Sequence, residues 1–240
     1  METCPEYFKS EPVEHLEGWS SEEQRFLLGR LFQIDTISHN FFLTGGTALS
    51  SFYLGHQQSI DIDLFTTQET ISLMSLAPLF RNTIFPQKIF TQNDHFLSYL
   101  SEKGVKVDIV VDYLSDPSPR PRILMKNIPS TIVVDSFQNI AVKKICALIN
   151  RTDEKDVIDV MTIIHQAPVV EKEPALLWLM KEAGKREALA ADLIYLTELI
   201  SSLTDIFQKK ESFNFTDEFL LFEKTIAFLQ KTINNPFRQE

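Results

Sequence analysis

The stretch that decides the fold is FFLTGGTALSSFYLGHQQSIDIDLF, residues 41–65. It combines a Gly-Gly-Thr turn after an apolar run, a helix-like segment, and two aspartates separated by one isoleucine. Side chains two residues apart on a strand point to the same face, so Asp61 and Asp63 are expected to project together. The apolar side chains between and around them are expected on the opposite face, in a core: Ile60, Ile62 and Leu64.

This arrangement of acidic and glycine residues predicts a binding site. Two carboxylates held side by side repel each other, and a cation between them removes that cost. Because no His or Cys belongs to the group, its oxygen ligands suit a hard ion such as Mg²⁺ or Mn²⁺. Gly45 and Gly46 let the backbone approach a phosphate closely, and amide N–H groups at a helix start point toward it. We therefore expect Asp61 and Asp63 to bind a metal, and Gly45, Gly46 and Thr47 to bind a nucleoside triphosphate.

The same motifs resemble a known superfamily. A Gly-Gly or Gly-Ser turn followed by Asp-x-Asp resembles the DNA polymerase β-like nucleotidyltransferases. The fuller string TGGTAL, GH and SIDIDLF resembles the AbiEii/AbiGii toxin family of nucleotidyltransferases, and the resemblance is specific over about residues 25–165. It implies an enzyme that moves NMP from an NTP to an acceptor hydroxyl, the toxin of a toxin–antitoxin or abortive-infection pair. A tRNA or other RNA acceptor and a cognate antitoxin protein are implied with it.

A third carboxylate is expected beside the first two, because a neighbouring strand commonly completes such a site and supplies a proton acceptor. Asp108 is the best candidate for this third metal ligand and proton acceptor, since it follows Val105–Val107 on a strand expected to lie next to the Asp61 strand. The alternatives are Asp112, which shares its face, and an exposed Asp108 with no catalytic role.

A second cluster of charges lies on the predicted helices that follow. In FQNIAVKKICALINRTDEKDVIDVMTII, Lys143 and Lys144 belong to an amphipathic helix, and a Lys on a long stem can reach β- and γ-phosphates. The segment resembles the AbiEii/AbiGii pattern of a helical Lys followed by a basic residue and Asp-x-x-Asp. Lys144 then matches the family's Lys, a catalytic and nucleotide-binding position, and Asp156 matches the later Asp, with Asp159 beside it. The alternatives are a solvated helix face for Lys143 and a cap or salt bridge for Asp156.

Three positions near the aspartates carry weaker signals. Ser59 is expected to contact a phosphate or orient Asp61, or else simply to start a strand. His56 follows the glycine that ends a helix, where it either contacts nucleotide or interacts with the helix dipole. The family usually has Arg at the next position, whereas this chain has Gln57, which removes a cation expected near the phosphates.

The order of the elements, several strands followed by a run of helices, predicts an α+β protein with a sheet domain and then a helical C-terminal domain. The family resemblance implies that the sheet domain is a mixed-sheet nucleotidyltransferase core with flanking helices. Strands are expected at 41–43, 59–65, 88–99, 105–114 and 132–134, and helices from 21, over 47–54 and over 67–80. Later helices are expected at 135–150, 152–165, 172–183, 186–209 and 216–233. The catalytic domain with an N-terminal arm is placed at 1–134. The helical domain, at 135–240, is expected to complete the nucleotide site and to bind acceptor or partner.

Composition limits the partners and the location. The net charge of −10 argues against a generic nucleic-acid binder, so an RNA acceptor needs a local basic patch. The Pro-rich segment 115–130 offers Arg120, Arg122 and Lys126 for this purpose, although a solvated loop is the simpler interpretation. Two cysteines, no signal peptide and no apolar run long enough to span a bilayer favour a cytoplasmic protein without a membrane partner.

Two rival functions stay open. The acidic charge suits a small-molecule hydroxyl, as in aminoglycoside nucleotidyltransferases, or a protein hydroxyl better than a polyanion. The missing Arg at Gln57 also allows a degenerate member that binds nucleotide or a partner without catalysis. P-loop, Rossmann, HExxH, CxxC and GxSxG motifs are all absent from the sequence.

Overall fold

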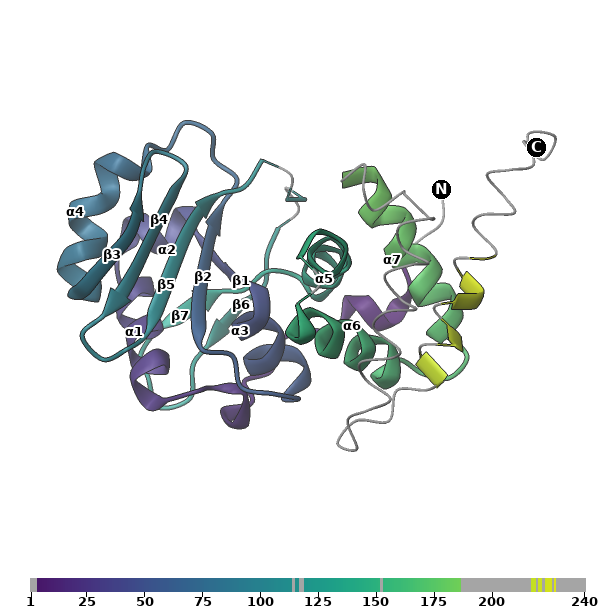
Figure 1. The fold of residues 1–240 in the computed structure, drawn as a ribbon. Coiled ribbons are helices and arrows are strands. Elements are labelled where there is room, and N and C mark those ends of the chain that lie inside the picture. The colour runs from purple at the N-terminus through teal and green to yellow at the C-terminus, as the bar shows by residue number, and fades with distance from the viewer. Residues whose placement is uncertain are drawn as a thin grey trace. The chain divides into compact units, whose positions relative to one another are not determined.

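The computed structural model of the chain contains a five-stranded sheet in the order β1-β2-β5-β4-β3 (Figure 1). The strand that carries Asp61 and Asp63 is β2, an interior strand of this sheet. β2 and β5 run parallel, and the other neighbours are antiparallel. The sheet is therefore mixed, as predicted. The strands are β1 (Phe42–Thr44), β2 (Asp61–Thr66), β3 (Pro86–Gln92), β4 (Phe96–Ser101) and β5 (Lys106–Val111).

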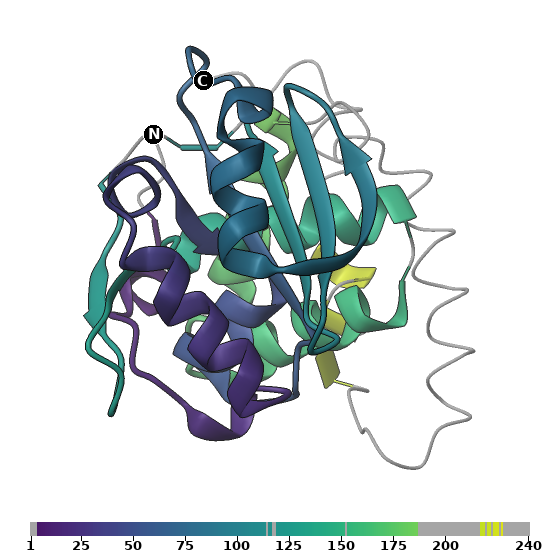
Figure 2. The same ribbon diagram turned by 90° about the vertical axis from the view of Figure 1, so that its left-hand side faces the viewer.

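Helices and short turns surround this sheet. α4 packs on β3 and β4 and lies beside α1 (Figure 2). The helices of the first half of the chain are α1 (Glu22–Phe32), α2 (Asp35–Asn40), α3 (Gly45–Leu49) and α4 (Leu73–Ile84). α3 continues into the π-helical η3 (Ser50–Leu54). The other elements are η1 (Glu6–Lys9), η2 (Leu16–Gly18), β6 (Arg122–Leu124) paired with β7 (Thr131–Val133), α5 (Phe137–Arg151), α6 (Glu154–Gln166) and α7 (Lys172–Arg186).

The chain divides into two units, Ser10–Ile140 with the sheet, and Met1–Lys9 together with Ala141–Glu240. The structure describes residues 4–113, 115–116, 119–151, 153–186, 217–218, 220–221, 223–225 and 227. Apart from Arg186, the last residue of α7, the predicted helix at 186–209 lies outside these residues, as does most of the one at 216–233. Among the described residues, no helix has both the length and the apolar character that a membrane crossing requires.

Alternation of side chains sets the two faces of β2 and β5. Ile62 and Leu64 are fully buried, as are Val107 and Ile109 of β5, while the residues between them are half-exposed. The expectation that Ile60 joins this core was wrong, because its side chain is 57% exposed. β2 begins only at Asp61, so the alternation that buries its apolar face does not yet apply at Ile60.

The expected strand at 88–99 is in fact a hairpin of β3 and β4. Asn93 makes the turn, because its side-chain oxygen accepts hydrogen bonds from the backbone N–H of His95 (3.0 Å) and Phe96 (2.8 Å). This is the local bond by which Asn reverses a chain. The Asn-Asp pair at 93–94 was the sequence signal for the turn.

Side-chain caps fix the starts of several helices. The Ser21 hydroxyl accepts from Gln24 N (3.1 Å) at the start of α1, and the Ser136 hydroxyl accepts from Asn139 N (3.3 Å) in α5. Asp153 caps α6 through Lys155 N (3.1 Å). α4 begins later than the expected 67–80, because Ser72 supplies its cap.

The N-terminal turn packs in the helical unit. Phe8 is buried and its ring stacks on Trp178 at 5.4 Å between centroids. The Tyr7 hydroxyl donates to the carbonyl of Ile163 at 2.9 Å. Through these contacts, η1 belongs to the unit that holds the later helices.

Candidate active site

The predicted acidic residues of the sheet unit come together on one face of β2 and β5. The parallel register sets Asp61 beside Lys106 and Asp63 beside Asp108. All four residues are half-exposed and alternate with the buried positions of their strands. Three carboxylates and one ammonium thus share a face that the core does not cover.

Lys106 neutralises part of this acidic cluster. Its Nζ lies 2.5 Å from Asp108 Oδ2 and 3.9 Å from Asp61 Oδ2. Burial opposes the charge on Lys106, but the hydrogen bond to Asp108 and the charges of Asp108, Asp61 and Asp63 outweigh it, so its pKa is raised. The other Asp108 oxygen, Oδ1, accepts from the Ser98 hydroxyl at 2.5 Å.

The glycine turn meets the second aspartate directly. Gly45 has a φ of +70°, a left-handed conformation that side chains other than glycine rarely adopt. A Cβ atom placed on Gly45 would overlap the Asp63 carboxylate. Register explains the proximity, because Thr44, which precedes the turn, pairs with Asp63 across β1 and β2. The sequence requires glycine here both for backbone conformation and for space.

Gln24 is a positioning residue that the sequence analysis missed. It is fully buried, and its side-chain nitrogen donates to the Ser59 carbonyl (2.9 Å), the Asp61 carbonyl (3.3 Å) and the Thr47 hydroxyl (3.3 Å). Thr47 Oγ1 also donates to the Asp61 carbonyl. The Gln24 amide of α1 thus links α3, through Thr47, to the start of β2. The available sequence signal was a Gln on the core-facing side of the predicted amphipathic helix, because a buried amide must find hydrogen-bond partners.

A second network missed from the sequence lies at the end of β1. Asp135 is 1% exposed and accepts from the Thr44 hydroxyl (2.8 Å), Asn139 Nδ2 (2.7 Å) and Arg120 Nε (3.1 Å). The Arg120 guanidinium also lies 3.6 Å from the centre of the Phe42 ring. The expectation of a solvated loop was wrong for Arg120, because this ion pair and this ring contact hold it in the fold. Four prolines nearby masked that role in the sequence.

The donor chemistry of the acidic face fits a hard divalent ion, since every ligand is a carboxylate oxygen. Among the residues that the structure describes, however, no group of three or more His, Cys, Asp or Glu is arranged to hold a metal. Asp108 already bonds Ser98 and Lys106, which leaves Asp61 and Asp63 as the primary candidates. Mg²⁺ is usually bound by one or two carboxylates together with substrate phosphates, so a pair of aspartates meets that requirement.

The second predicted cluster forms a buried ion-pair network in the helical unit. Lys144 is 7% exposed, and its Nζ lies 2.5 Å from Asp159 Oδ2 and 3.3 Å from Asp156 Oδ1. Burial opposes its charge, but the two carboxylates raise its pKa. Arg151 adds a bidentate bond to Asp156 at 2.6 and 2.9 Å. Lys143, on the same helix, is half-buried.

Comparison with known families identifies the chain. Residues 26–229 match the family profile described as "Nucleotidyl transferase AbiEii toxin, Type IV TA system". The chain belongs to this family. It is therefore a nucleotidyltransferase of the AbiEii toxin type, as the sequence motifs indicated.

Solved structures with detectable similarity to this AbiEii-family chain are remote in sequence. A candidate nucleotidyltransferase from H. pylori has 15% identity and a TM-score of 0.49, over 89% of this chain and 97% of its own. The nucleotidyltransferase toxin MenT4 from Mycobacterium tuberculosis has 13% identity and a TM-score of 0.49, over 87% and 82%. An antigenic nucleotidyltransferase-like protein from Paracoccidioides brasiliensis has 18% identity and a TM-score of 0.44, over 75% and 94%. No curated protein matches the chain.

The weaker predicted positions of this AbiEii chain lie around the start of β2. Ser59 offers its backbone carbonyl to Gln24 and forms an isolated bridge with Trp19. His56 and Gln57 follow Gly55, whose φ of +60° ends η3, and both are half-exposed.

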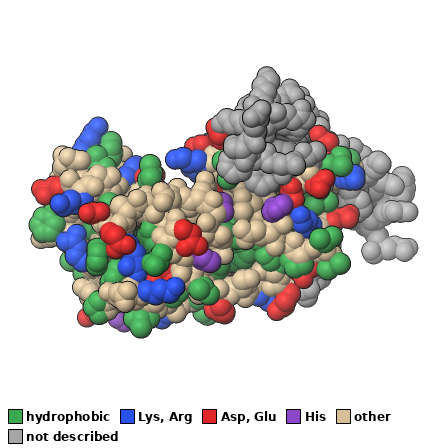
Figure 3. Space-filling view, turned by 90° about the horizontal axis from the view of Figure 1, so that it is seen from below, with side chains coloured by type: hydrophobic (Ala, Val, Ile, Leu, Met, Phe, Trp, Pro, Cys, Tyr) green, Lys and Arg blue, Asp and Glu red, His purple; other side chains and the backbone are tan. Residues whose placement is uncertain are grey.

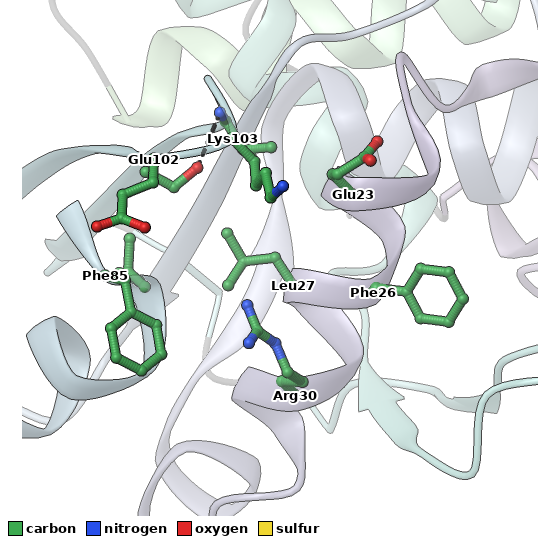
Figure 4. Close-up of a pocket in the computed structure, with 10 residues that line it drawn as sticks. Glu23, Phe26, Leu27, Arg30, Phe85, Glu102 and Lys103 are labelled. Carbon is green, nitrogen blue, oxygen red and sulfur yellow. Dashed lines mark hydrogen bonds between the residues drawn. The ribbon is translucent and has the colours of Figure 1, made fainter. Parts of the chain in front are cut away.

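A cavity of about 250 Å³ in the AbiEii sheet unit lies away from the predicted site residues (Figure 4). It is bounded by α1, the end of α4 and the turn between β4 and β5, and Figure 4 shows the Phe26 side chain directed away from the other labelled side chains. None of the predicted site residues lines it. Its lining consists of Glu23, Phe26, Leu27, Arg30, Ile84, Phe85, Ser101, Glu102, Lys103 and Val105.

Proposed function

We propose that this AbiEii-family enzyme transfers NMP from an NTP to an acceptor hydroxyl and depends on Mg²⁺ or Mn²⁺. The observation that carries the proposal is the shared face of Asp61, Asp63 and Asp108, with the Gly45 turn lying directly against Asp63. The carboxylates could bind the divalent ion of a metal-bound triphosphate, and the glycine turn, which has no Cβ, would let a phosphate approach the backbone.

In the proposed reaction, the acceptor oxygen forms a bond to the α-phosphorus while the bond from phosphorus to the pyrophosphate oxygen breaks. Pyrophosphate leaves with the bonding electrons, and the hydroxyl proton passes to a carboxylate, for which we propose Asp108. A bound divalent ion would supply positive charge against the triphosphate and the leaving group. Asp61 and Asp63 are the proposed ligands, while Gly45, Gly46 and Thr47 are proposed to approach the phosphates.

The helical unit is proposed to contribute to nucleotide binding through Lys143, Lys144 and Asp156. The ammonium of Lys144 is already within 3.3 Å of two buried carboxylates. We therefore propose that Lys144 and Asp156 mainly fix α5 against α6, and that Lys143, on the same helix, reaches the phosphates.

An RNA such as tRNA is the first proposed acceptor. The AbiEii family description supports the toxin of a toxin–antitoxin system, and a cognate antitoxin protein is the proposed partner. A small-molecule or protein hydroxyl is the second, for a specific reason. An RNA acceptor needs a basic patch, but Arg120, one of its candidate residues, is held by Asp135. On the described part of the face in Figure 3, acidic and basic side chains are interspersed and form no such patch. Cys4 and Cys146 are free thiols, which fits the proposed reducing cytoplasm.

The proposal is tested by incubating the protein with each of four α-³²P-labelled NTPs, Mg²⁺ and a cell extract. Label is expected in one fraction, from one preferred NTP, and is expected to disappear when EDTA is added. Label that ribonuclease removes identifies RNA, and RNA labelling should weaken steeply with salt whereas small-molecule labelling should not. Transfer at an unchanged rate in EDTA would contradict metal dependence.

A further inference from the structure

Lys106 has a position that the proposed reaction does not explain. The register of β2 and β5 sets it directly beside Asp61, and its ammonium lies between the carboxylates of Asp61 (3.9 Å) and Asp108 (2.5 Å). Its side chain is 35% exposed, so it reaches this place from the rim of the acidic face rather than from the core. A single cation thus bridges the two strands that carry the proposed metal ligands.

The ammonium of Lys106 reduces the repulsion between the carboxylates, which a divalent ion would otherwise do. Carboxylates crowded on one face repel each other, and an opposite charge within about 4–6 Å removes that cost. Lys106 is within this distance of Asp61 and Asp108. With Ser98 on the remaining oxygen of Asp108, both oxygens of that carboxylate already accept a hydrogen bond.

We propose that Lys106 is an internal counter-ion that couples metal binding to nucleotide binding. In the protein alone, the ammonium occupies the Asp61–Asp108 face and repels a divalent ion, so the metal affinity is low. A triphosphate offers the ammonium another anionic partner, which the four-carbon stem of Lys can follow. Metal and nucleotide then favour each other's binding, as linkage between two sites requires. Lys106 is a positioning residue in this account, which rests on the proposed metal-dependent transfer.

The test measures Mn²⁺ binding by electron paramagnetic resonance, without any nucleotide, in the full chain and its variants. We expect Lys106→Met to bind Mn²⁺ at least about fivefold more tightly than the parent, the lower end of usual site-to-site coupling. Lys106→Arg, which keeps the charge, should restore the parental affinity. Lys103→Met, in the turn three residues earlier, removes the same charge away from the aspartates and should change nothing. Thermal melts confirm that each variant is folded.

A second arm adds inert α,β-methylene analogues of the four NTPs. The parent should gain more Mn²⁺ affinity from the preferred analogue than Lys106→Met does. Equal Mn²⁺ affinity in the parent and in folded Lys106→Met, or weaker binding in Lys106→Met, overturns the counter-ion inference alone. If no protein binds Mn²⁺ with or without an analogue, the metal-dependent function fails, and this inference fails with it.

Discussion

Gly45 is the residue at which backbone geometry and site chemistry meet. Its positive φ and the overlap that a Cβ would make with Asp63 are two separate reasons for glycine at one position. The sequence indicated the first reason, through the Gly-Gly turn. It did not indicate the second, because the pairing of Thr44 with Asp63 is set by the sheet and not by local pattern.

Gly45→Ala is expected to abolish nucleotidyl transfer and to lower the free energy of unfolding by about 1–2 kcal/mol from the left-handed backbone alone. Gly104→Ala is the matched control, because Gly104 has a φ of +78° but no heavy atom within 4 Å of an added Cβ. It should lose similar stability and keep its activity. Denaturant unfolding and labelled-NTP transfer measure the two effects. Equal activity in both variants would show that the contact with Asp63 is not needed.

Gln24→Met removes the amide that holds Ser59, Asp61 and Thr47 while keeping nearly the same volume. Leaving buried acceptors without a partner is expected to cost about 1–3 kcal/mol of unfolding free energy. Gln33→Met, at the exposed residue that follows the same helix, should change stability little. Urea denaturation compares the two variants, and indistinguishable midpoints would rule out the positioning role of Gln24.

Strand pairing and helix contacts decide which of the predicted residues meet. The alternation in SIDIDLF and VKVDIVV predicted the shared face of Asp61 and Asp63, and a neighbouring strand for Asp108. The place of Lys106 opposite Asp61 follows only from the register, which a single sequence does not fix. In the same way, the sequence placed Lys144 on a helix and left a salt bridge open for Asp156. The burial of Lys144 with both Asp156 and Asp159 follows only from the packing of the helices.

Lys144→Met is expected to destabilise the helical unit by about 3–5 kcal/mol, because it leaves the buried Asp156 and Asp159 with less compensation. Lys155→Met removes the same charge from an exposed position on α6 and should have little effect. Thermal unfolding followed by far-UV circular dichroism measures the difference. A Lys144→Met protein with parental stability and weakened NTP binding would instead assign this lysine to the phosphates.

Glu218 connects two helices, accepting from Lys172 of α7 at 2.8 Å and lying 3.0 Å from His165 of α6. Burial opposes its charge, but these hydrogen bonds lower its pKa. A lowered folded-state pKa means that the stabilisation is present above the ordinary Glu pKa of about 4.3 and is lost as the pH falls through the folded value. Glu218→Gln should therefore melt lower than the parent at pH 7, with a gap that narrows below about pH 4.

The control for this pH dependence is Glu223→Gln, which removes an exposed carboxylate from the same segment. It should match the parent throughout the titration. A Glu218→Gln deficit that stays constant from pH 7 to pH 3 would contradict the ion-pair explanation.

At the scale of the whole molecule, the α+β class, the mixed sheet and the family were all predictable, because each depends on local periodicity or on the 41–65 motif. The Gln24 amide and the Asp135 network were not predicted, since each joins segments that no motif spans. The hairpin at Asn93 was missed although the Asn-Asp pair at 93–94 is a local signal for its turn. The division of roles between the two units stays a prediction. The net charge of −10 suits a small-molecule or protein acceptor better than RNA, so the acceptor is the part of the proposed function that the sequence determines least.

The most direct test of the account is the rate of NMP transfer by Asp63→Asn, measured with the preferred α-labelled NTP and saturating Mn²⁺. The substitution removes one charged ligand oxygen but keeps the shape beside Gly45. Asp94→Asn, an exposed position in the same unit, serves as the control. We predict a folded Asp63→Asn protein with transfer reduced at least about a thousandfold, roughly 4 kcal/mol of transition-state stabilisation, beside a fully active Asp94→Asn. Transfer at the parental rate by folded Asp63→Asn would contradict the central claim.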